Sequence, residues 1–168
     1  LCKIILASYM KQMDTPPEIT DRTALTRNRA RHHPDALFLH QSVADELKER
    51  LTEVNRTFTA PAVVTGFPAL WGEWMPSAKV VEDSETLDLQ EGAHDLVIHA
   101  LSLHWADDPI GQLVQCRRAL QPDGMLIATL FSGQTLHELR SVLAEAEVTQ
   151  TGGLSPRILP MGEVRDLG

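Results

Sequence analysis

Two apolar segments on either side of a helical segment constrain the fold more than any other part of this sequence. Residues 95–100 read DLVIHA and residues 124–131 read GMLIATLF, without the alternation of a half-exposed strand. Strands of this kind are buried on both faces, as in parallel sheets. Between them, Asp107 or Asp108 can cap a helix that has Pro109 in its first turn. The order strand, helix, strand predicts a βαβ unit with a right-handed crossover.

The rest of the chain continues this alternation. Asp21 is a good N-cap and Pro34 ends the helical pattern that follows it. We expect helices at residues 22–33, 36–54, 67–76 and 135–148 and strands at residues 61–66 and 78–83. The predicted fold class is α/β: a reduced, Rossmann-like, mostly parallel sheet with helices on both faces and two N-terminal helices.

The termini suggest a division of the 168 residues. The chain begins at Leu1, and Met13 precedes a proline-rich stretch, so we expect residues 1–14 to be a disordered or non-native leader. The N-terminal helices then occupy residues 15–58, and the α/β domain occupies residues 59–168. Because the sequence stops in what looks like the start of a helix, we expect this domain to be truncated at its C-terminus.

Charge and cysteine content narrow the classes of function. The net charge is −8, and residues 61–168 hold six Lys and Arg against fifteen Asp and Glu. Such an acidic body argues against binding to nucleic acid. No apolar run has the roughly 20 residues that a membrane span needs. The two distant cysteines, Cys2 and Cys116, indicate a reducing compartment such as the cytoplasm, and no histidine has metal-site spacing, so we expect no metal.

A basic cluster near the N-terminus has two interpretations. It is either a solvated helix face or a docking patch for an acidic partner. Its members are Arg22, Arg27, Arg29, Arg31, His32 and His33.

In open parallel sheets, ligands bind at the carboxyl ends of the strands. Thr65 and Gly66 follow the first strand, and Glu82 and Asp83 follow the second. Residues 99–105, HALSLHW, follow the third. We therefore expect the binding site among these residues.

Three pieces of the sequence resemble one family. HDLVIHALSLHWADDP, RRALQPDGMLIATLFSGQTLHELR and GGLSPRILPMGEVRDLG follow one another at sensible spacing. They resemble class I (type 11) S-adenosylmethionine-dependent methyltransferases. The nearest branch contains the malonyl-carrier-protein methyltransferase of biotin synthesis and the mitochondrial complex I assembly factor that hydroxylates an arginine.

The resemblance implies S-adenosylmethionine as the cofactor and residues that bind it. In the family, a glycine-rich loop after the first strand lets backbone N–H groups reach the cofactor. Here that loop reads VVTGFPALWGEW, a degraded form in which Gly66 is followed by Phe67 and Pro68. The implied contacts are Thr65 and Gly66 for the methionine end and Glu82 and Asp83 for the adenosine end.

The distance from Gly66 to Asp95 is under 30 residues, which is short for a full first half of the fold. We therefore expect residues 78–83 to match the family's third strand. Glu82 or Asp83 would bind the ribose only in a rewired chain; otherwise they form a solvated strand end.

In this family the region after the third buried strand lines the pocket between cofactor and substrate. The resemblance thus implies Leu101 as a cofactor contact, and His104 and Trp105 as catalytic residues. His104 could orient a substrate or act as a base near neutral pH. Packing alone could also explain His104, and Trp105 could be a structural lid. Arg157 could meet an anionic substrate or be an exposed loop residue.

Two functions remain open. One is methyl transfer to a small-molecule or protein acceptor, with the hydroxylase branch as a variant. The other is a binding module that keeps the sheet without the chemistry and serves as an assembly or scaffold protein. Methyl transfer is our main hypothesis, and the degraded glycine loop is the main support for the alternative.

Overall fold

The computed structural model describes residues 18–155, 161–163 and 165. They belong to two compact units, residues 1–129 and residues 130–168, and each unit is considered by itself. The expected leader at residues 1–14, Cys2 and Arg157 lie outside the described residues.

In the described part of the chain, the first helices of this unit are α2, Arg22–Ala30, and α3, Phe38–Glu53. Asp21 caps α2 as predicted, because its carboxylate accepts a hydrogen bond from the backbone N–H of Ala24 at 2.8 Å. Helix α2 is three residues shorter than expected. Its continuation is interrupted because Pro34 opens a separate 3₁₀ turn, η1, Pro34–Leu37.

Four parallel strands form one sheet in the order β2-β1-β3-β4. Their bounds are Pro61–Thr65 for β1, Lys79–Glu82 for β2, His94–Ala100 for β3 and Leu120–Thr129 for β4. Strand β4 starts earlier than predicted and ends two residues earlier. The parallel registry places Thr65 beside both Glu82 and Ala100, so the carboxyl ends of three strands meet at one edge.

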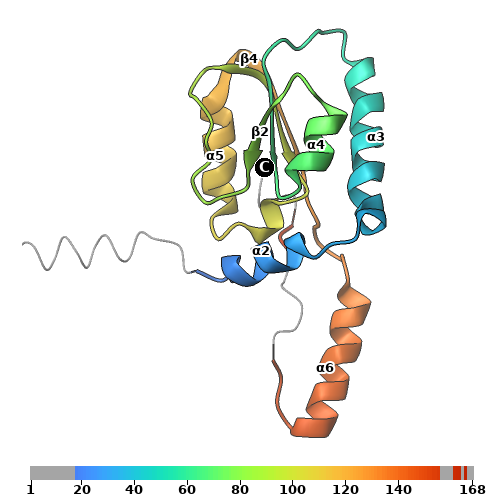
Figure 1. The fold of residues 1–168 in the computed structure, drawn as a ribbon. Helices are drawn as coiled ribbons and strands as arrows, with labels where there is room; N and C mark the ends of the chain where they lie inside the picture. Colours follow the sequence, from blue (N-terminus) through green and yellow to red (C-terminus); the bar gives the residue numbers. More distant parts are fainter. Residues whose placement is uncertain (1–17, 156–160, 164, 166–168) are drawn as a thin grey trace, which may run out of the picture. The chain divides into compact units, whose positions relative to one another are not determined.

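Helices cover both faces of this sheet, as predicted (Figure 1). Alternate residues of β1 and β3 point to opposite faces, which divides the apolar core into two clusters. On one face Val63, Leu96 and Ile98 pack with α3 and with Trp71 of α4, Pro68–Trp74. On the other face Val64 and Val97 pack with α5, Pro109–Ala119. This is the predicted α/β, Rossmann-like arrangement.

Strand β2 lies at one edge of the sheet and is hydrogen-bonded directly to β1, from Ala62 to Thr65. A seven-residue helix, α4, suffices for the crossover between the two strands. The expectation that residues 78–83 match the family's third strand stays a prediction.

Two aspartates set element boundaries. Asp95 accepts hydrogen bonds from Thr59 and from the backbone N–H of Ala60, which joins the start of β3 to the start of β1. Burial alone would raise the pKa of Asp95, but these hydrogen bonds outweigh it and lower the pKa. Asp108, not Asp107, caps α5 through the backbone N–H of Gly111 at 2.7 Å.

The second unit contains α6, His137–Thr151, which begins two residues later than predicted. It ends at Gly152, whose positive φ of 72° is the left-handed conformation that glycine adopts readily.

Candidate functional site

A cavity of about 580 Å³ lies at the carboxyl ends of β1 and β2. Its floor consists of the segments that follow these strands, residues 66–70 and 82–85. Helix α2 contributes Arg22, Leu25, Thr26 and Arg29 to the opposite wall. These four residues have the spacing i, i+3, i+4, i+7, which is one face of a helix. Cavities of this size suit small-molecule ligands.

Three of the predicted site residues line this cavity: Gly66, Glu82 and Asp83. Thr65, Leu101, His104 and Trp105 do not belong to its lining. The roles predicted for all seven residues remain predictions.

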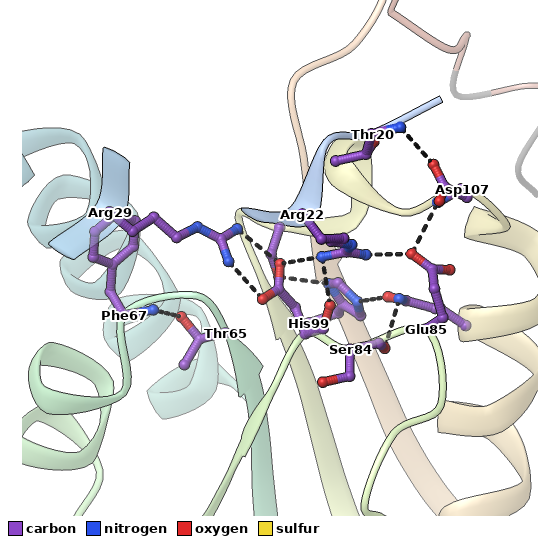
Figure 2. A network of polar contacts seen from close by, with 12 residues as sticks. Thr20, Arg22, Arg29, Thr65, Phe67, Ser84, Glu85, His99 and Asp107 are labelled. Carbon is purple, nitrogen blue, oxygen red and sulfur yellow. Dashed lines mark hydrogen bonds and ion pairs between the residues drawn. The ribbon is translucent and has the colours of Figure 1, made fainter. Parts of the chain in front are cut away.

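Asp83 is buried and is bound by Arg22 and Arg29 of α2. Both arginines are labelled in Figure 2. Arg29 donates to both carboxylate oxygens, Nη1 to Oδ1 at 2.7 Å and Nη2 to Oδ2 at 2.8 Å. Arg22 Nη1 donates to the Asp83 carbonyl oxygen at 2.9 Å. Only 4% of Asp83 is exposed, so it is not the solvated strand end that the sequence left open. A bidentate arginine–carboxylate pair that is so little exposed to solvent is among the stronger ion pairs in proteins.

The polar contacts continue from Arg22 to the segment that precedes α2. Arg22 Nη2 also donates to the carboxylate of Glu85, which in turn accepts from the backbone N–H of Asp107. The Asp107 carboxylate accepts hydrogen bonds from the backbone N–H groups of Ile19 at 3.0 Å and Thr20 at 2.9 Å. Burial would raise the pKa of Asp107, but these hydrogen bonds and Arg22 lower it. Asp107 therefore fastens the start of α2 to the sheet instead of capping α5.

Gly66 leaves room for the Arg29 guanidinium. A Cβ at this position would lie 2.2 Å from Arg29 Cζ and 2.6 Å from Nε, which is far inside van der Waals contact. The same guanidinium lies 5.8 Å from the centre of the Phe67 ring. Gly66 thus admits the side chain of Arg29 at the carboxyl end of β1.

The carboxylate of Glu82, unlike that of Asp83, makes no hydrogen bond or ion pair with the described residues. Glu82 is exposed and lines the cavity. Its backbone lies beside Thr65 at the end of the sheet. Its carboxylate is available to accept hydrogen bonds from a ligand.

Thr65 and Leu101 stabilise the turns that follow β1 and β3. Thr65 is fully buried and its hydroxyl oxygen accepts the backbone N–H of Phe67 at 3.1 Å. Leu101 has a φ of 47°, which is unfavourable for a residue with a side chain. Its N–H donates to the carbonyl oxygen of Thr129 at 3.0 Å, which holds the chain in this turn.

His99 is a fully buried core histidine whose two ring nitrogens both have hydrogen-bond partners. Gln112 donates from Nε2 to the Ser84 carbonyl oxygen at 3.0 Å, so its Oε1 faces His99. His99 Nε2 lies 2.8 Å from this Oε1 and must donate, while Nδ1 accepts from the Ser102 hydroxyl at 3.4 Å. Burial lowers the pKa of His99 and keeps the ring neutral.

His104 and Trp105 lie in a short 3₁₀ turn, η2, Leu103–Trp105. Burial and the nearby Arg29 charge lower the pKa of His104 to about 4. His104 is therefore neutral at pH 7, and its predicted role as a base or as an orienting group stays a prediction. Trp105 is 37% exposed, and its ring centre is 5.3 Å from that of His104.

The arginines of the basic cluster differ in their environments. Arg22 and Arg29 are not part of a solvated face, because both are engaged with Asp83 and its neighbours. Arg27, on the same helix, is exposed. The seven-residue separation of Arg22 and Arg29 was the signal that could have shown that both lie on one side of the helix.

The thiol of Cys116 has a structural role. Cys116 is fully buried in the core beside Val97, and burial raises the pKa of its thiol to about 12.

Among the described residues, no three His, Cys, Asp or Glu side chains are grouped so as to bind a metal ion. None of the helices in the described part of the chain is long and apolar enough to cross a membrane.

Comparisons with known proteins identify relatives of this sequence. The arginine-hydroxylase NDUFAF5, mitochondrial, of Mus musculus is 44% identical over 94 residues, which are 56% of this chain and 27% of that protein. The Homo sapiens protein of the same name is 45% identical over the same shares. The malonyl-[acyl-carrier protein] O-methyltransferase of Xylella fastidiosa is 32% identical over 95 residues, 56% of this chain and 30% of that protein. The matched stretch thus spans between a quarter and a third of the length of these relatives.

The sequence pattern of one family covers more than half of the chain. It matches residues 42–128, from α3 through β4, which include the whole sheet and the floor of the cavity. The chain belongs to the methyltransferase domain family.

Proposed function

We propose that this chain binds S-adenosylmethionine in the cavity beneath α2 and serves methyl transfer to an acceptor. The observation that supports the proposal is the Glu82 carboxylate, which lines a cavity of about 580 Å³ at the end of β2 and has no partner in the part of the chain that the structure describes. A carboxylate there can accept hydrogen bonds from vicinal hydroxyls of a ribose.

The cavity suits the rest of the cofactor. Leu25 and Leu37 provide apolar surface for the adenine, together with Phe67 and Leu70 from the floor. Arg22 and Arg29 provide positive charge for a carboxylate. The cofactor supplies an activated methyl group, so the protein needs to orient the two reactants and exclude water. Helix α2 lies over the cavity and can therefore exclude water from it.

The acceptor is a small molecule or a protein, and we place it on the side of η2. His104 is neutral at pH 7 and can orient an acceptor through a hydrogen bond, and Trp105 offers an exposed ring for an apolar part. Thr65 and Leu101 support the cofactor indirectly by holding the ends of β1 and β3.

Calorimetric titration with S-adenosylmethionine tests the proposal. We expect saturable binding in the micromolar range, and a loss of about tenfold or more in Glu82→Gln, since hydrogen bonds to charged groups contribute about 1.5–3 kcal/mol. Glu73→Gln is the matched control, because Glu73 is exposed on α4 and does not line the cavity. Absence of heat and of any thermal shift at millimolar cofactor would exclude the proposed function.

A second candidate is an assembly or scaffold protein of the same fold. Two observations favour it: Arg29 already fills the space over Gly66, and it occupies both carboxylate oxygens of Asp83. The name of the mouse relative adds hydroxylation of arginine as a variant. The same titration separates the candidates, because a scaffold gives no cofactor binding.

We propose the cytoplasm as the compartment, because the free thiol of Cys116 suits reducing conditions. The mouse relative is named as mitochondrial. Subcellular fractionation of the tagged chain distinguishes the two locations.

A further inference from the structure

The segment that follows β2 is held by two glutamines of α5. Gln112 Nε2 donates to the carbonyl oxygen of Ser84 at 3.0 Å, and Gln115 Nε2 donates to that of Glu85 at 2.9 Å. Gln115 Oε1 also accepts the backbone N–H of Leu87 at 2.8 Å. The two glutamines are three residues apart, which places them on one face of the helix. Side chains of α5 therefore fix a stretch of backbone that belongs to no helix or strand.

His99 sets the orientation of Gln112. A glutamine amide carries a donor and an acceptor at its end, and only the donor can bond to a carbonyl oxygen such as that of Ser84. His99 Nε2 donates to Gln112 Oε1 at 2.8 Å, which leaves Gln112 Nε2 directed at Ser84. Only 0% of His99 and 1% of Gln112 are exposed, so water does not compete for these hydrogen bonds. Any other orientation of the amide would leave buried polar groups unsatisfied, which is costly.

The segment held in this way lines the proposed cofactor cavity. Ser84 and Glu85 belong to the lining, whereas His99 and Gln112 do not. Arg22 of α2 donates to the carboxylate of Glu85. The segment is thus bonded to α2 and to α5 at once. Ser84, Glu85 and His99 are labelled in Figure 2.

A neighbouring position shows that joining β3 to α5 does not require a buried histidine. Val97 lies two residues before His99, so both side chains point to the same face of the sheet. Val97 packs there in an apolar cluster with Cys116 of α5. This contact joins the strand to the helix without any bond to the segment after β2. What His99 adds is the fixed orientation of Gln112, and through it the bond to Ser84.

We infer that His99 and Gln112 are positioning residues for the cofactor cavity. His99 orients Gln112, and Gln112 holds Ser84 and the residues beside it in the shape that receives the ligand. This inference rests on the proposed function, because it gives two buried side chains a part in the binding of S-adenosylmethionine. A segment that is fixed before the ligand arrives does not have to be ordered on binding, which raises the affinity.

Calorimetric titration with S-adenosylmethionine tests this chain of contacts. His99→Leu and Gln112→Met should each weaken binding about fivefold or more, because each removes a hydrogen bond on which the segment depends. The double variant should bind no more weakly than Gln112→Met, since His99 acts only through Gln112. His99→Gln should recover most of the affinity, because its amide N–H can replace the ring N–H. Gln112→Ala is a second variant at its position and should give the same loss as Gln112→Met.

Val97→Ala is the matched control. It leaves a cavity on the same strand and the same face without breaking a hydrogen bond, so it lowers stability but should not change the affinity for the cofactor. Circular dichroism confirms that each variant is folded before it is titrated.

A measurement without ligand provides a second readout. In Gln112→Met we expect amide hydrogen exchange in residues 84–87 to accelerate about threefold or more, because the segment opens more often. Exchange in β1 should not change. An unchanged rate in residues 84–87 would show that the segment is held without Gln112.

The results that overturn the inference differ from the one that overturns the proposed function. If the wild type binds the cofactor and both single variants bind it equally well, the pair serves the core alone. If the two effects multiply in the double variant, or if His99→Gln binds as weakly as His99→Leu, His99 does not act through Gln112. If Val97→Ala weakens binding as much as Gln112→Met, lost stability explains the effect. Absence of binding by the wild type removes the proposed function itself.

Discussion

At the scale of single residues, the contrast between Gly66 and Gly72 shows how differently two glycines on neighbouring elements are constrained. The space above Gly66 is filled by an Arg29 guanidinium that Asp83 fixes in place. The nearest atom to a Cβ at Gly72 would be Val80 Cγ2 at 3.5 Å, an ordinary contact, and Gly72 lies within a helix. The first glycine is needed for packing against a charged group, and the second is not.

We therefore expect Gly66→Ala to destabilise the protein by about 1–3 kcal/mol, because overfilling forces the guanidinium away from Asp83. Gly72→Ala should be neutral or stabilise by up to about 1 kcal/mol, since alanine favours the helix. Urea denaturation followed by circular dichroism measures both. Equal effects of the two substitutions would contradict the role assigned to Gly66.

At the scale of elements, α2 is attached to the sheet by polar contacts. None of its residues is buried, so apolar packing contributes little to its position. It is held by Asp107 at its start and by the pairs that Arg22 and Arg29 make with Glu85 and Asp83. Such an element can detach while the core remains folded.

Asp107→Ala should therefore release α2 without unfolding the sheet. Two charge-assisted hydrogen bonds are lost, and we expect amide hydrogen exchange in residues 22–30 to accelerate by about tenfold or more. Exchange in β1 and β3 should not change. Mass-spectrometric hydrogen exchange measures this, with exposed Asp45→Ala as the control. Unchanged exchange in α2 would show that another contact holds the helix.

At the scale of the whole molecule, burial of histidines couples stability to pH. His40, His99 and His104 have lowered pKa values, each mainly because burial disfavours the charged ring. In the unfolded chain these rings titrate near 6.5. Between about pH 6.5 and pH 4 the unfolded state thus binds more protons than the folded state, so the free energy of unfolding falls as the pH falls.

His104→Gln should flatten this dependence, because glutamine cannot take up the proton that destabilises the folded state. We expect the variant to lose less stability than the wild type between about pH 7 and about pH 5. Urea denaturation at both values measures the difference. His33→Gln, at an exposed position, should behave like the wild type. An equally steep fall in His104→Gln would mean that His104 is not buried in its neutral form.

The sequence by itself determined the α/β fold class and most element positions. Unbroken apolar runs such as residues 95–100 require burial on both faces, and a strand buried in this way needs helices on each side. The helix cap at Asp21 and the end of β1 near Gly66 were also predictable from the sequence, because such local features depend on neighbouring residues alone. For the same reason the sequence located Glu82 and Asp83 at a strand end.

Only the tertiary structure decided which of these residues is available to a ligand. Arg22 and Arg29, which lie far earlier in the chain, bind Asp83, whereas the Glu82 carboxylate has no partner among the residues that the structure describes. The choice of β2 as the neighbour of β1 and the lowered pKa of His104 have the same origin. Strand pairing, burial and ion pairs between distant segments depend on how the whole chain packs, and no local pattern encodes them.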